Sequence, residues 1–166
     1  MDKKLIGIGL IAVVGLIISL ALTGQNEVAS QAPALTTTRD SVTVLLDNKV
    51  IPAKDFIHLY DATPYMIMSG HIAAKLPCDA KGESELKIVV GQAPDVKPVD
   101  MELVKELSSV GKMCIYHVDL PPEGIDVVTD VALVNPTDKP IRFPRTSTVV
   151  IGINEIMQLG GPTGHE

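Results

Sequence analysis

The sequence predicts a mainly β protein: an antiparallel β-sandwich with one inserted amphipathic helix, preceded by a single N-terminal transmembrane helix. Three observations lead to this fold class. Residues 5–22 form a hydrophobic run without a charged side chain. From residue 41 onward, short β-branched and apolar runs alternate with turn residues. Between residues 98 and 111, the apolar positions recur instead at helical spacing.

The N-terminal hydrophobic run is long enough to cross a membrane. As a helix it would extend roughly 27 Å, close to the thickness of the hydrocarbon core. Lys3 and Lys4 precede it, which predicts an N-terminus inside the cell and a C-terminal domain outside. We therefore expect residues 1–24 to form a retained single-pass anchor in the cell membrane. A signal peptide cleaved after residues 28–30 (Val-Ala-Ser) is the alternative.

Small side chains lie on one face of the predicted anchor. Ala12, Gly15 and Ser19 are spaced so that they share this face, and small residues allow two membrane helices to approach closely. We therefore expect this face to pack against a helix of another subunit of a membrane complex. The alternative is that these residues reflect only the general abundance of small residues in membrane helices.

The exported part divides into three segments. Residues 25–40 are rich in Gln, Ala, Thr and Ser and are expected to form a flexible tether. Residues 41–159 are expected to form the β-sandwich, similar in architecture to immunoglobulin and cupredoxin domains, and residues 160–166 a disordered tail. The helix is predicted from Val99, Leu103, Leu107 and Val110. The expected strands cover residues 41–46, 49–51, 65–76, 86–90, 113–120, 125–134 and 146–156.

Charge and aromatic content exclude some partners. The net charge is −6, so the surface repels the phosphate groups of nucleic acids. The chain has no Trp, three Tyr and two Phe, too few for an aromatic platform that stacks bases. We therefore expect a membrane and other protein subunits, and no nucleic acid, as partners.

The two cysteines are predicted to form a disulfide. Cys78 and Cys114 both fall outside the membrane by the orientation argument, and an exported compartment is oxidising. In their strands, each shares its face with apolar side chains, so both thiols are expected to point toward the interior.

A copper site is the competing interpretation. Met66, Met68 and His71 lie within six residues, and Met113 and His117 share one face of a later strand. Thioether and imidazole ligands suit Cu(I) outside the cytoplasm. The plainer interpretation is that the methionines fill the core and that the histidines lie in a turn and on the surface.

Residues 63–68 (Thr-Pro-Tyr-Met-Ile-Met) and 135–137 (Asn-Pro-Thr) resemble uncharacterised membrane-anchored exported proteins of ammonia-oxidising archaea. The resemblance implies an anchored exported domain and assigns no activity. Because copper is prominent in the physiology of that group, the resemblance also favours the copper alternative.

The sequence contains no nucleophile elbow, zinc-protease motif, phosphate loop or dinucleotide fingerprint in its exported part. We therefore expect a non-enzymatic interaction module or accessory subunit of a membrane protein complex, with no cofactor. The alternative is an exported copper-binding or copper-delivery protein that uses a Met/His site.

Overall fold

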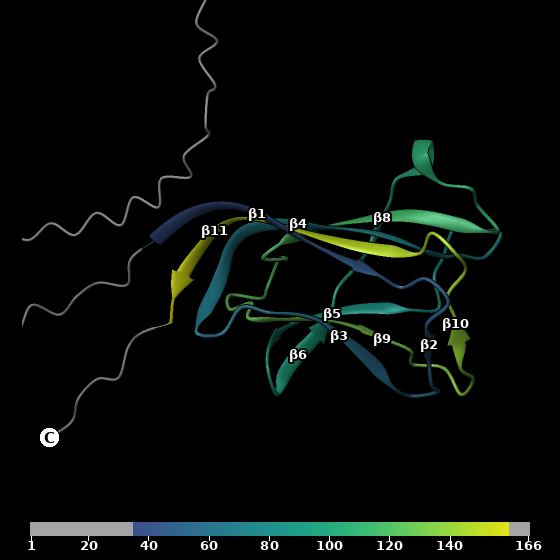
Figure 1. The fold of residues 1–166 in the computed structure, drawn as a ribbon, viewed down its shortest axis with the longest axis horizontal. Helices are drawn as coiled ribbons and strands as arrows, with labels where there is room; N and C mark the ends of the chain where they lie inside the picture. Colours follow the sequence, from purple (N-terminus) through teal and green to yellow (C-terminus); the bar gives the residue numbers. More distant parts are fainter. Residues whose placement is uncertain (1–34, 160–166) are drawn as a thin grey trace, which may run out of the picture. The chain divides into compact units, whose positions relative to one another are not determined.

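The computed structural model describes residues 35–159, with side chains from residue 39 onward, and confirms a mainly β protein built from antiparallel sheets. A five-stranded and a four-stranded sheet form two layers, with a small two-stranded sheet at one end (Figure 1). The five-stranded sheet contains, in spatial order, β1 (Leu35–Leu45), β11 (Thr148–Gln158), β4 (Tyr65–Pro77), β8 (Met113–Leu120) and β7 (Glu102–Leu103).

The second layer is shorter along the strand direction. In spatial order its strands are β3 (Phe56–Asp61), β9 (Asp130–Val134), β5 (Lys87–Gln92) and β6 (Asp95–Pro98). The small sheet pairs β10 (Ile141–Arg142) with β2 (Val50–Ile51), and a 3-10 turn, η1, covers Lys105–Leu107.

The core lies between the two layers and follows from strand alternation. Successive side chains of a strand point to opposite faces, so every second residue enters the core. In β11, for example, Val149, Ile151 and Ile153 are buried. The other strands contribute in the same way, with Ile72, Ala74 and Leu76 from β4, Cys114, Tyr116 and Val118 from β8, Ile88 and Val90 from β5, and Val131 and Leu133 from β9.

The predicted disulfide is present. Cys78 and Cys114 are bonded, with their Cα atoms 5.7 Å apart. Cys114 is fully buried on the inner face of β8, and its register partner on β4 is Leu76, two residues before Cys78. The bridge therefore closes the end of the β4–β8 pair, on the core side.

The amphipathic helix predicted over residues 98–111 is wrong. The segment contains β7 and η1 instead, and Leu107 and Val110 of the expected apolar face are 66% and 47% exposed. The backbone pairs with the edge of β8, where the N–H of Val104 donates to the C=O of Ile115. Pairing with the edge of β8 gives hydrogen-bond partners to backbone N–H and C=O groups of this segment, as a helix would have done. The helical spacing of a few apolar residues therefore does not decide between the two structures.

Strand boundaries also differ from the expected ones. Strand β1 begins at Leu35, inside the segment predicted as a tether. The strand expected over 125–134 is reduced to β9, and the sequence analysis did not predict β3, β6, β7 or β10.

Several predictions fall on residues that the structure does not describe. They are the membrane anchor with Ala12, Gly15 and Ser19, the tether up to residue 34, and the tail over residues 160–166. Over residues 35–159, the structure contains no helix of the length and hydrophobicity that crossing a membrane requires.

Candidate functional site

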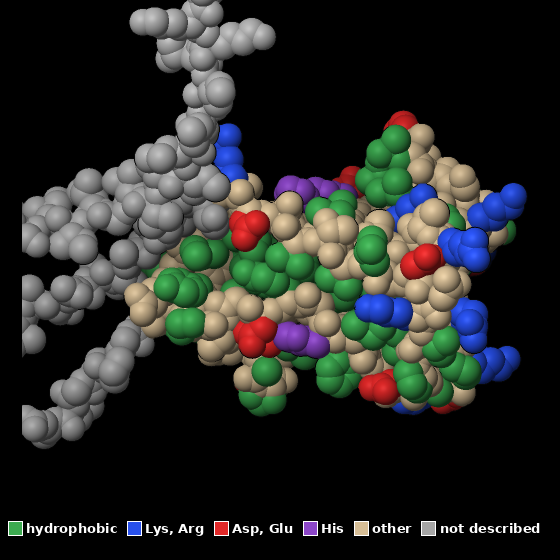
Figure 2. Space-filling model, in the orientation of Figure 1, with side chains coloured by type: hydrophobic (Ala, Val, Ile, Leu, Met, Phe, Trp, Pro, Cys, Tyr) green, Lys and Arg blue, Asp and Glu red, His purple; other side chains and the backbone are tan. Residues whose placement is uncertain are grey.

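Two of the predicted metal ligands meet on the outer face of the five-stranded sheet. His71 lies on β4 and His117 on β8, and their rings stack with centroids 5.9 Å apart and planes inclined by 21°. The ring of His71 covers Gly152 of β11, where a Cβ atom would collide with it. The missing side chain at Gly152 thus leaves the space in which His71 lies. In Figure 2, histidine side chains form a group on the surface over this sheet.

Carboxylates surround this histidine pair. The Nε2 atom of His117 lies 3.0 Å from Oδ1 of Asp119, and Asp119 is the register partner of His71. Glu102 of β7 is the register partner of His117. Each histidine of the pair therefore has an acidic residue as its cross-strand neighbour, and negative charge nearby favours cations over anions.

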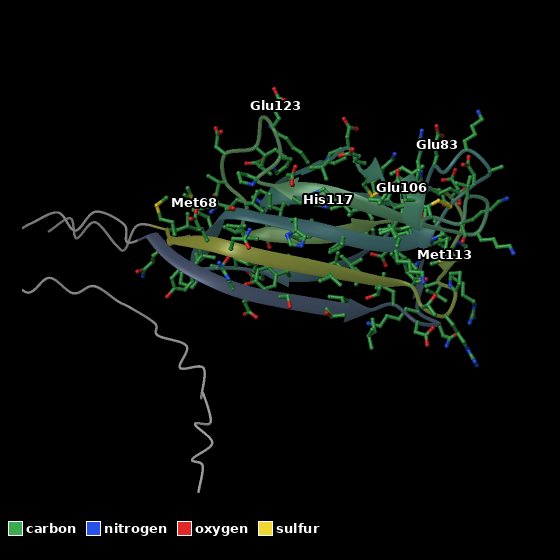
Figure 3. The ribbon with its side chains drawn as sticks, turned by 90° about the horizontal axis from the view of Figure 1, so that it is seen from above. Met68, Glu83, Glu106, Met113, His117 and Glu123 are labelled. Atoms are coloured by element: carbon green, nitrogen blue, oxygen red, sulfur yellow. A yellow bond between two sulfur atoms is a disulfide. The ribbon has the colours of Figure 1, made fainter. Side chains whose placement is uncertain are left out.

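The three methionines lie elsewhere on the sheet. Met113 is four residues from His117 along β8, a distance of roughly 13 Å at the spacing of a strand. Met66 pairs with Met157 of β11, beyond a register shift that separates it from His71. Met68 and Met113 lie toward opposite ends of the sheet, with His117 between them (Figure 3). The five residues of the copper alternative are thus split into one histidine pair and separate methionines.

The described residues hold no larger metal cluster. Over residues 35–159, no three His, Cys, Asp or Glu side chains are grouped closely enough to hold a metal ion. A groove of about 440 Å³ adjoins the histidine pair, and it is lined by Asp100, Glu102, His117, Asp119 and Glu123 among others. Its acidic lining disfavours anionic ligands.

A second His–Asp contact lies on the four-stranded sheet. The Nε2 atom of His58 is 3.2 Å from Oδ1 of Asp130, and the hydroxyl of Thr129 donates to Oδ2 of the same carboxylate at 2.6 Å. Burial acts to raise the pKa of Asp130, but hydrogen bonds from Thr129, the N–H of Ala93 and His58 together lower it. These contacts from Thr129, Ala93 and His58 hold the carboxylate of Asp130 in place.

Comparisons with known proteins give no family. Protein-family models show no match to the chain, and a search of the curated proteins also finds none. The function is therefore argued from the exposed side chains and strand edges of the described residues.

Among the described strands, β1 leaves one side of its backbone without a strand partner. This strand has 11 residues and forms the margin of the five-stranded sheet, where β11 pairs with one side of it (Figure 3). Within residues 35–159, no strand pairs with its other side. Residues 41–46 (Ser-Val-Thr-Val-Leu-Leu) contain no charge and no proline, and Leu45 is 66% exposed. We call this strip, residues 41–46, the β1 edge.

The other sheet margins carry the features that prevent edge-to-edge pairing. Strand β7 has only two residues, and β6 has four, including Asp95, Lys97 and Pro98. Strand β3 is interrupted by a register shift between His58 and Tyr60. Short, charged, proline-containing or bulged strands resist addition of a further strand, whereas long uncharged ones invite it. Strand β1 also has a register shift, between Thr37 and Asp40, but residues 41–45 after it are regular and contain no charge and no proline.

Sequence reasoning identified part of these sites. In a strand, residues two apart lie on the same face, so the sequence alone could have placed Asp119 beside His117. Gly152 and Glu102 join the histidine pair through strand pairing, which the sequence does not give. The strand over residues 41–46 was predicted, but its position at the margin of the sheet follows only from the topology.

Proposed function

We propose that this chain is a non-enzymatic interaction module, held on the outer face of a membrane, that joins another subunit by adding a strand to the β1 edge. The observation that carries the proposal is the open side of residues 41–45 of β1, which no described strand pairs with and which are uncharged and regular. The membrane location rests on the hydrophobic run at residues 5–22 and on Lys3 and Lys4.

Strand addition suits this edge for two physical reasons. An added strand gives partners to N–H and C=O groups along the whole margin, and these main-chain hydrogen bonds supply affinity. It also covers Leu45, whose side chain is 66% exposed, and apolar burial favours association. Figure 2 views the molecule from the side of this edge, and most side chains along it are hydrophobic or uncharged.

The proposal is tested by photo-crosslinking in the native membrane. A photoreactive phenylalanine derivative replaces Leu45 in the full chain, and irradiation should yield crosslinked products. Leu107 is the matched control, because it is also 66% exposed but lies on η1. We expect products from position 45 and none from position 107. Equal yields at both positions, or none at position 45, would contradict the proposal.

A proline variant links the crosslink to strand addition. The N–H of Leu46, directly after β1, donates to the C=O of Ser147, directly before β11, and strand alternation therefore directs the N–H of Thr43 to the open side. Thr43→Pro removes a donor from the open side and keeps the ladder with β11, since proline is tolerated where the N–H faces solvent. The crosslink from position 45 should fall in this variant while its circular dichroism spectrum stays unchanged.

Copper binding is the second candidate, and the contact between His71 and His117 supports it. The two imidazoles offer a pair of nitrogen ligands of the kind that suit copper. Titration of the purified full chain with copper should give one bound ion, lost in His71→Ala and in His117→Ala. His58→Ala on the other sheet is the control and should retain it. Binding that survives both replacements would exclude this site.

A further inference from the structure

A groove with an acidic rim lies at the margin of the five-stranded sheet opposite the β1 edge. It is the groove of about 440 Å³ beside His117, where β7 and β8 adjoin the loop that follows β8. We infer that this groove, here called the acidic groove, binds an extended lysine- or arginine-rich segment of a partner protein. Strands β1 and β7 are the two margins of the sheet, so this is a second interaction surface that goes beyond the proposed function.

The charges around the acidic groove favour a cationic ligand. Four carboxylates and one ammonium group line it, and all five side chains are exposed. They belong to Asp100, Glu102, Asp119, Glu123 and Lys97. Like charges gathered around one groove repel one another, and a bound cation relieves this repulsion.

Three of these carboxylates are available to a ligand. Elsewhere in the chain, Asp79 and Asp130 accept hydrogen bonds from backbone N–H groups, which hold their carboxylates in place. In the part of the chain that the structure describes, no hydrogen bond or salt bridge engages the carboxylates of Asp100, Glu102 and Glu123, and Asp119 contacts only His117. These groups can therefore bind a cation without breaking a contact of the fold.

The acidic groove also has an apolar lining, which selects a basic side chain over a bare metal ion. Its apolar members are Pro98, Val99, Val118, Pro122 and Ile125. Lysine and arginine have long aliphatic stems that cover apolar surface while their charged ends reach polar groups. A metal ion would use the carboxylates alone, and over residues 35–159 no three acidic, His or Cys side chains are close enough to hold one.

The spacing of the carboxylates fits an extended peptide. Glu102 on β7 is the register partner of His117 on β8, and Asp119 follows His117 by two residues on the same face. Glu102 and Asp119 are thus one step of roughly 7 Å apart along β8, which is also the distance between alternate side chains of an extended peptide. Glu123 continues this row on the loop beyond β8, on the side of the sheet away from β1 (Figure 3).

The test measures binding of a basic peptide to the full chain in detergent micelles. The probe is a fluorescein-labelled, acetylated peptide of about seven residues that alternates lysine with serine, so that its charges have the period of a strand. Fluorescence anisotropy should show saturable binding at about 50 mM salt and weaker binding at about 500 mM, because salt screens exposed charges. The absence of binding at the lower salt concentration would overturn the inference.

Two charge-matched variants locate the bound peptide. The groove variant combines Glu102→Gln, Asp119→Asn and Glu123→Gln. It should raise the dissociation constant by about tenfold, since each exposed ion pair contributes a factor of roughly two to three.

The control variant removes the same charge at exposed positions outside the acidic groove. It combines Asp47→Asn, Glu85→Gln and Glu106→Gln. The control should change the dissociation constant by less than about twofold, because these carboxylates lie outside the groove and are screened by salt. Equal weakening in both variants would mean that the peptide responds only to net charge, and the acidic groove would be excluded as its site.

A single substitution with the opposite sign separates binding from folding. Lys97→Gln removes the one ammonium group of the acidic groove and should lower the dissociation constant by about twofold. Loss of folding cannot produce tighter binding. An unchanged or higher dissociation constant in Lys97→Gln would contradict the inferred site.

Spermine distinguishes a free polyamine from a protein segment, because it carries about the same charge as the probe and has no peptide backbone. Its amine groups lie on one thin chain, so it cannot extend separate side chains to carboxylates on β7 and β8. As a competitor, spermine should need a concentration at least about tenfold above that of the unlabelled peptide. Displacement at equal concentrations would overturn the protein segment as the occupant of the acidic groove.

Discussion

Loss of the Cys78–Cys114 disulfide should lower the stability of the domain by about 4 kcal/mol. The bridge joins residues 36 apart in sequence, and the chain-entropy model gives about this value for a closed loop of that length. The loop contains β5 and β6 of one sheet and β7 of the other. The bridge therefore restricts the unfolded conformations of a segment that contributes strands to both layers of the fold.

Two variants of the experiment separate loop closure from packing. Reduction of the native disulfide leaves both sulfur atoms in place, so it should cost about 4 kcal/mol from loop closure alone. Replacement of both residues, Cys78→Ser with Cys114→Ala, also removes a sulfur from a fully buried position and should cost about 1 kcal/mol more.

The assay is urea denaturation followed by far-ultraviolet circular dichroism, because the chain has no Trp for fluorescence. The measurement uses a chain that begins at Gln31, four residues before the start of β1. A change of less than about 1 kcal/mol on reduction would refute the reasoning, since the loop would then be restrained without the bridge.

Three further predictions follow from buried contacts. Asn135→Ala should cost roughly 2–4 kcal/mol in urea denaturation, because the fully buried side chain donates to three backbone carbonyls, which would lose their partner. Burial, with smaller contributions from nearby carboxylates, raises the pKa of Tyr116 to about 12. The resulting stabilisation should be fully present below about pH 10 and lost as the pH rises toward 12, as ultraviolet titration and unfolding at several pH values would measure. Gly70→Ala should lower the free energy of unfolding by about 1–3 kcal/mol, because the new Cβ atom would meet the backbone of Gly152. In Gly152→Ala the new Cβ atom would meet the ring of His71, which can move. This variant should therefore mainly separate the two imidazoles, as histidine NMR shifts would report.

Local patterns predicted the elements that depend on neighbouring residues. The alternation in residues 65–76 and 113–120 gave β4 and β8, and it placed Cys114 on the inner face and His117 on the outer one. The disulfide followed from the same alternation and from the two-cysteine count. These features are set by the period of a strand, which the sequence displays directly.

The helix predicted over residues 98–111 shows the limit of this reasoning. Apolar residues at helical spacing also suit an irregular segment that pairs with a sheet edge, as the N–H of Val104 does with Ile115. The choice depends on whether an unpaired strand lies within reach, and that is a property of the tertiary structure.

The sequence by itself determined most of the longer strands (β1, β4, β5, β8 and β11), the disulfide and the uncharged character of residues 41–46. Only the tertiary structure placed β1 at an open margin, brought His71 against His117, and separated both from Met113. The physical reason is that strand pairing joins residues far apart in the chain. Such pairs are selected by the register and order of whole strands, and no local pattern in either strand records which neighbour it will have.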